Sequence, residues 1–93
     1  MNANQLKNYR LAILRILDRN PTSRLFGLTS IALFLREFGF KSEPAEVLRE
    51  LAYLEGEPLG YVQPVDARDF SPECRAWRIT TRGMNFLALE AGE

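Results

Sequence analysis

The sequence predicts a single α+β domain that is mainly helical, with four helices and one short pair of antiparallel strands. Three observations support this fold class. Apolar residues recur at three- and four-residue spacing in four segments, which is the period of an amphipathic helix. Two short runs rich in β-branched and aromatic residues flank a polar stretch, as expected for a hairpin. The length of 93 residues suits one domain with one modest core.

Residues 5–18 form the first predicted helix, and the pair Asn20-Pro21 ends it, because proline disfavours a helical conformation in the residue before it. Its apolar face consists of Leu6, Tyr9, Ala12, Ile13, Ile16 and Leu17. Leu11 and Leu14 do not belong to that face and are expected among charged residues on the exposed side.

The second predicted helix follows a short extended piece at residues 24–28. Thr29 or Ser30 can cap its first turn, and Gly39 ends it, since glycine readily takes the left-handed conformation found after a helix. Its apolar face consists of Ile31, Phe34, Leu35 and Phe38.

The third predicted helix opens at Ser42 or Glu43, tolerates Pro44 in its first turn, and ends at Gly56 and Pro58. The residues predicted to be buried are Ala45, Val47, Leu48, Leu51, Ala52 and Leu54. The residues predicted on the opposite, exposed face are Glu43, Glu46, Arg49, Glu50 and Tyr53.

Residues 59–65 and 76–80 are the two predicted strands, joined by the polar segment DARDFSPECR. Thr80 or Thr81 then caps a last helix that carries Met84, Phe86, Leu87 and Leu89. Ten periodically placed apolar residues are predicted to form the core: Leu6, Ile13, Ile31, Leu35, Leu48, Leu51, Val62, Trp77, Ile79 and Leu87.

Three segments of this order, IALFLREFGFKSEPAEVLRELAYL, GYV and WRITTRGMNFLAL, resemble the winged-helix repressors. More closely, RLAILRIL, SEPAEVLRELAYLEGEPLGYV and WRITTRGMNFLALEAG are similar to small winged-helix proteins encoded in Mu-like phages and prophages. The resemblance covers nearly the whole chain. It implies a winged helix-turn-helix over residues 1–93, with a small antiparallel β-wing, a C-terminal helix and a DNA-binding role in transcription regulation.

Composition narrows the function classes. With 46% hydrophobic and 26% charged residues and no net charge, the chain has the make-up of an ordinary globular domain. Cys74 is the single cysteine and there is no histidine, so neither a disulfide framework nor a zinc site of the usual kind is expected. No group of residues has the pattern of a catalytic site, a metal site or a cofactor site. We therefore expect a cytoplasmic protein that is not an enzyme and does not enter membranes.

Charge is unevenly distributed along the chain. Residues 1–41 hold seven basic and two acidic side chains, whereas residues 42–65 hold one basic and five acidic side chains. In a helix-turn-helix the third helix enters the major groove of DNA, where acidic side chains repel phosphate. Compensating cations are expected near the helix, on the wing and, with Arg82, at the start of the last helix. The candidate DNA-binding residues are Arg24, Lys41, Ser42, Glu46, Arg49, Tyr53, Arg68, Arg75 and Arg78.

A second hypothesis treats the acidic helix as a surface for another protein of phage or host, in an interaction or assembly module that binds no DNA. Two leucines on the charged side of the first helix, Leu11 and Leu14, suggest a homodimer interface.

Overall fold

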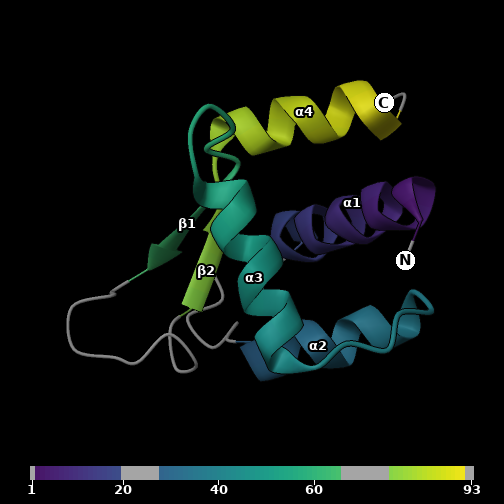
Figure 1. The fold of residues 1–93 in the computed structure, drawn as a ribbon. Coiled ribbons are helices and arrows are strands. Elements are labelled where there is room, and N and C mark those ends of the chain that lie inside the picture. Colours follow the sequence, from purple (N-terminus) through teal and green to yellow (C-terminus); the bar gives the residue numbers. More distant parts are fainter. Residues whose placement is uncertain (1, 20–27, 66–75, 92–93) are drawn as a thin grey trace.

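The computed structural model describes residues 2–19, 28–65 and 76–91 of the chain. Figure 1 shows four helices and one two-stranded antiparallel sheet in these segments. The elements are α1 (Ala3–Arg19), α2 (Leu28–Glu37), α3 (Pro44–Glu55), β1 (Val62–Val65), β2 (Ala76–Ile79) and α4 (Thr81–Ala91). The predicted α+β class, mainly helical with a small antiparallel sheet, is confirmed. In these segments no helix has both the length and the apolar character to cross a bilayer.

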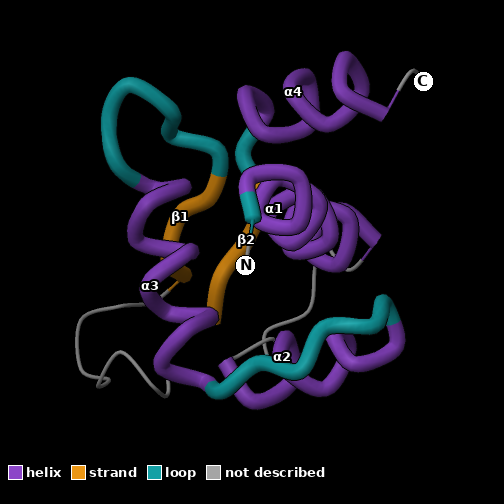
Figure 2. Tube along the Cα trace, turned by 45° about the vertical axis from the view of Figure 1, so that its right-hand side comes forward, coloured by secondary structure: helices purple, strands orange, loops and turns teal. Residues whose placement is uncertain are grey.

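Helix α1 lies in the middle of the domain. In Figure 2 it is seen nearly end-on, with α4 above it, α2 below it, and the strands and α3 beside it. Its contacts with α2, α4 and β2 cover it on several sides. Seven of its residues are buried: Tyr9, Leu11, Ala12, Ile13, Leu14, Ile16 and Leu17.

This central position overturns the prediction for Leu11 and Leu14, which were expected to be exposed at a dimer interface. Leu11 is 8% exposed and Leu14 is 0% exposed. The prediction assumed a helix with one buried face, whereas neighbours on several sides leave α1 no wide solvent-facing side. The assignment of these two residues to a dimer interface has therefore lost its basis.

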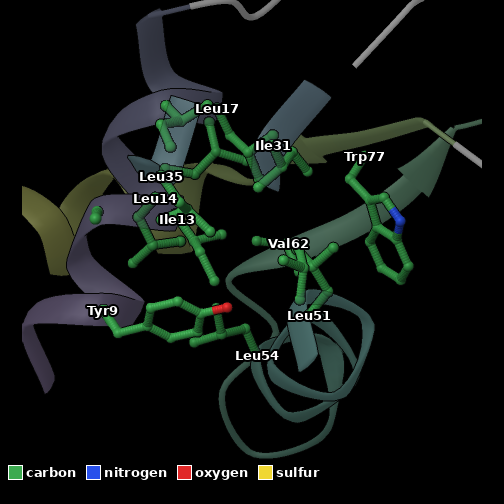
Figure 3. Close-up of a cluster of buried hydrophobic side chains, with 14 of the residues drawn as sticks. Tyr9, Ile13, Leu14, Leu17, Ile31, Leu35, Leu51, Leu54, Val62 and Trp77 are labelled. Atoms are coloured by element: carbon green, nitrogen blue, oxygen red, sulfur yellow. The ribbon is translucent and has the colours of Figure 1, made fainter. Parts of the chain in front are cut away.

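The core fills the space between α1, α2, α3 and the sheet. Figure 3 shows residues of α1 meeting Ile31 and Leu35 of α2, Leu51 and Leu54 of α3, and Val62 and Trp77 of the strands. Eight of the ten predicted core residues are buried, namely Ile13, Ile31, Leu35, Leu51, Val62, Trp77, Ile79 and Leu87. Leu6 and Leu48 are only half-buried, and Phe34, predicted on the buried face of α2, is 38% exposed.

The turn between α2 and α3 begins at Gly39, as predicted, with φ of 90°. The Gly39 N–H donates to the Arg36 carbonyl at 3.0 Å, and the Phe40 N–H donates to the Leu35 carbonyl at 2.9 Å. These two bonds satisfy the last carbonyls of α2 in a Schellman motif. The Phe40 ring packs edge-on against Tyr9 of α1, with ring centres 5.3 Å apart, so the turn is fixed to the core.

Thr80 joins the sheet to α4. Its N–H donates to the Tyr61 carbonyl at 2.9 Å, and its hydroxyl donates to the Gly60 carbonyl at 2.7 Å. The same hydroxyl accepts the Gly83 N–H at 3.1 Å, which makes Thr80 the predicted N-cap of α4. The strands pair with Val62 opposite Ile79, so the start of α4 lies directly beside the chain that enters β1.

Gly83 makes this close approach possible, and replacing it by alanine is expected to destabilise the protein. A Cβ at residue 83 would lie 2.2 Å from the Tyr61 carbonyl oxygen, so backbone would have to move. We expect Gly83→Ala to lower the free energy of unfolding by about 1–3 kcal/mol, although alanine favours helix. Urea denaturation followed by circular dichroism measures this loss.

Gly56→Ala is the matched control. Gly56 has φ of −66°, and a Cβ there would lie 3.5 Å from its nearest neighbour, the Ala52 carbonyl oxygen. We expect this variant to stay within about 0.5 kcal/mol of the parent protein. Equal stability of both variants would show that α4 does not start so close to Tyr61.

Candidate nucleic-acid interface

Helix α3 exposes a line of one arginine between two alanines. Ala45, Arg49 and Ala52 follow at helical spacing and are all exposed, while the opposite side buries Val47 and Leu51. The prediction that Ala45 and Ala52 are buried is wrong. Because the buried stripe of α3 is narrow, the two alanines flank Arg49 on the solvent side, where their small side chains leave it protruding.

Glu50, predicted on the exposed face, instead turns toward α1. Its Oε2 accepts a hydrogen bond from Nε of Arg10 at 2.6 Å, and the two side chains are only 14% and 27% exposed. The Arg10 guanidinium carbon also lies 3.9 Å from the centre of the Tyr53 ring, a cation–π contact. Arg10 thereby ties two successive turns of α3 to α1.

This pairing changes the charge that α3 presents. Glu50 is neutralised by Arg10 and does not face outward. Of the remaining candidates, Glu46, Arg49 and Tyr53 are exposed, so Arg49 is opposed by one acidic neighbour on the same stretch of helix. The outward face of α3 is thus less negative than its sequence indicates, although Glu43 and Glu55 at its two ends are exposed as well.

Tyr9 of α1 and Ser42, which precedes α3, are both buried near the first turn of α3. Ser42 was predicted to contact DNA, but it is 8% exposed and its hydroxyl oxygen is out of reach of solvent, so its side chain contributes to packing. Burial raises the pKa of Tyr9, the Ser42 hydroxyl opposes that shift, and the carboxylates of Glu46 and Glu50 raise the pKa further. The Tyr9 phenol therefore stays neutral well above neutral pH.

Exposed cations lie at two places around α3. Lys41, a predicted site residue, and Arg36 line a hollow of about 510 Å³ at the start of α3, which Glu43 and Glu46 also border. Arg78, also predicted, lies opposite Gln63 in the sheet on the side that faces away from buried Trp77 and Ile79. The predicted residues Arg24, Arg68 and Arg75 lie outside the described residues.

Arg82, expected from the sequence as a further cation at the start of the last helix, lines the same hollow as Arg78. Arg82 lines a hollow of about 580 Å³ together with Arg78, Gln63 and Thr81. Its guanidinium donates to the Pro58 carbonyl at 2.8 Å, which holds the side chain across the start of α4. Arg78 lies in β2 and Arg82 in the first turn of α4, and the turn at Thr80 between these elements places both side chains around this hollow.

Arg10 is the residue beside α3 whose contacts sequence reasoning missed. Its partner Glu50 lies 40 residues away, and neither the spacing nor the composition of α1 signals such a pair. Within the described residues there is no group of three or more His, Cys, Asp or Glu side chains arranged to hold a metal ion. Cys74 and the acidic residues of the loop between the strands lie outside these residues.

Comparison of the chain with family models, with curated proteins and with solved structures found no match.

The half-buried pair Arg10–Glu50 is expected to contribute more to stability than the exposed pair Lys7–Glu90. Arg10→Met leaves the Glu50 carboxylate without its partner, so we expect a loss of about 1.5–3 kcal/mol in the free energy of unfolding. Lys7→Met breaks a 2.7 Å contact in which Lys7 is 58% exposed, and should cost less than about 1 kcal/mol. Urea denaturation of both variants measures the difference.

A double-mutant cycle separates the pair from other effects of Arg10→Met. In the Glu50→Gln background the same substitution should cost clearly less, because no buried carboxylate is then left unpaired. Equal costs in both backgrounds would contradict a stabilising role for the ion pair.

Proposed function

We propose that the chain is a winged-helix DNA-binding domain, acting as a transcriptional regulator of the phage or prophage type. The order of elements supports this: α2, a tight turn and α3 form a helix-turn-helix, the β1–β2 hairpin is the wing, and α4 closes the domain. In this arrangement α3 is the helix that enters the major groove, and the wing lies against the neighbouring backbone.

The observation that carries the proposal is the exposed line Ala45–Arg49–Ala52. Small residues on either side of Arg49 let the helix approach the floor of the groove, and an arginine is the side chain best suited to grip guanine O6 and N7. Glu46 can accept a hydrogen bond from a cytosine amino group in the same groove. Tyr53 is 52% exposed and is held in place by Arg10.

The negative charge at the ends of α3 requires cations that hold phosphates, because phosphate contacts supply most of the affinity for DNA. Lys41 and Arg36 at the start of α3, and Arg78 and Arg82 at the sheet, are the exposed candidates among the described residues. They offer cations at two places, beside the start of α3 and at the sheet, where phosphate contacts could fix the position of a base contact by Arg49.

Titration of the protein into fluorescently labelled random duplex DNA at two salt concentrations is the first test. We expect binding that weakens by about tenfold or more between about 50 and 200 mM salt, since counterions are released when cations meet phosphates. Absence of binding at low salt would refute the proposal.

Arg49→Ala is expected to weaken binding to a DNA site selected from a random library. Loss of a bidentate contact to guanine costs about 1–3 kcal/mol of discrimination, whereas stability should change by less than about 0.5 kcal/mol because the side chain is exposed. Competition titrations against the selected and a scrambled site measure the discrimination.

Arg19→Ala is the control for lost positive charge. Arg19 is also exposed but lies with Leu87 of α4 around a different hollow, away from α3. We expect its discrimination to be unchanged. Equal behaviour of the Arg49 and Arg19 variants would remove α3 from the mechanism.

A protein-interaction module that binds no DNA is the second candidate. Large apolar side chains on two helices favour it: Leu33 of α2 is 55% exposed and Leu89 of α4 is 83% exposed. Absence of DNA binding in the titrations would support this second candidate. The homodimer stays a prediction without an assigned surface.

A further inference from the structure

A pocket of about 320 Å³ opens between α1, the end of α3, the segment before β1, and α4. Its walls are mainly apolar, with Leu6 and Leu11 of α1 on one side and Leu59 of the segment before β1 on another. The rings of Tyr61 and Phe86, stacked on one another with centres 4.5 Å apart, form an aromatic wall. Its volume and lining are those of a small-molecule site, which is concave and mostly apolar with a few polar groups.

The charged side chains that line this pocket are both cations. Lys7 and Arg10 border it, and no acidic residue is among the described residues that line it. Glu90 and Glu50 pair with these two cations from outside the lining. Both cations can still bind another anion. The Lys7–Glu90 pair is exposed and therefore weak. Glu50 accepts a hydrogen bond from Nε of Arg10 only, and a guanidinium has five N–H donors. An apolar pocket with a cationic rim suits an amphipathic anion.

We propose that this pocket binds a small monocarboxylate with an apolar body, such as a medium-chain fatty acid or an aryl carboxylate. The apolar body lies on the leucines and the aromatic wall, and the carboxylate accepts hydrogen bonds from Lys7 and Arg10. A cationic ligand is repelled by the same two side chains, and a neutral one lacks the charged contact.

The pocket shares Arg10 and Tyr53 with the contact that fastens α3 to α1. An occupant that attracts the Arg10 guanidinium competes with Glu50 for it. Ligand binding and the orientation of α3 are therefore coupled through one side chain. Binding to the pocket does not itself depend on the proposed function, because the ligand contacts are made without DNA.

Octanoate, octanol and octylammonium are suitable probes, since they share one chain and differ in charge. With the full chain and no DNA, we expect octanoate to bind about tenfold or more tightly than octanol, because octanol lacks the charged hydrogen bonds to Lys7 and Arg10, and octylammonium to bind more weakly still. Two-dimensional NMR should place the octanoate-induced shifts at residues of the pocket such as Leu11, Tyr61 and Phe86. Equal affinity for all three, shifts elsewhere, or no binding would overturn the proposal.

Two variants test the assignment further. Leu6→Trp places a large ring at the half-buried edge of the pocket and should abolish octanoate binding, whereas Leu33→Trp, on the exposed side of α2, should not. Lys7→Met should lower affinity for octanoate and leave that for octanol unchanged, and it remains informative if Leu6→Trp does not fold. Octanoate binding that survives Leu6→Trp in a folded protein, or that is unaffected by Lys7→Met, would contradict the proposed site.

Discussion

The burial of α1 on several sides is the constraint on which the rest of the structure depends. Helices α2 and α4 and strand β2 all pack against it, and its buried residues run from Tyr9 to Leu17 without a wide exposed gap. A domain of this size has one small core, and a central helix that contacts several neighbours supplies much of its buried apolar surface. The positions of the other elements are set by how each one meets α1 or its direct partners.

The orientation of α3 follows from this arrangement. Val47, Leu51 and Leu54 form its narrow buried stripe, and the Arg10–Glu50 pair fixes the adjacent edge. An ion pair this little exposed costs desolvation, so its net contribution to stability is smaller than its short distance suggests. Its structural effect is directional: with Glu50 held against α1, Arg49 must project on the other side, between Ala45 and Ala52.

Sequence reasoning succeeded where structure is decided locally. The Gly39 helix end and the Thr80 cap depend on residues a few positions away, and both were predicted. It failed where the burial of a residue depends on how many elements pack around its helix. Periodicity locates an apolar face, but it does not show how much of the helix circumference is covered. Leu11 and Ser42 were predicted to be exposed and are buried, and Glu50 is turned toward α1, because residues distant in the sequence pack against them. The cations at the site were selected by residue type, and the turn at Thr80 between β2 and α4 places Arg78 and Arg82 around one hollow.

The charge of each surface, and not the zero net charge of the chain, determines which partners that surface can bind. The basic surplus of residues 1–41 is partly taken up by acidic residues of the later segments, through Arg10–Glu50 and Lys7–Glu90. Arg36 and Lys41 remain exposed beside α3, where they offset Glu43 and Glu46. Lys7 and Arg10 of α1 border an apolar pocket, whereas their partners Glu90 and Glu50 are not among its lining residues. The ion pairs between the halves of the chain thus moderate the acidity of α3, and Glu50 still engages only the Nε donor of Arg10 beside the pocket.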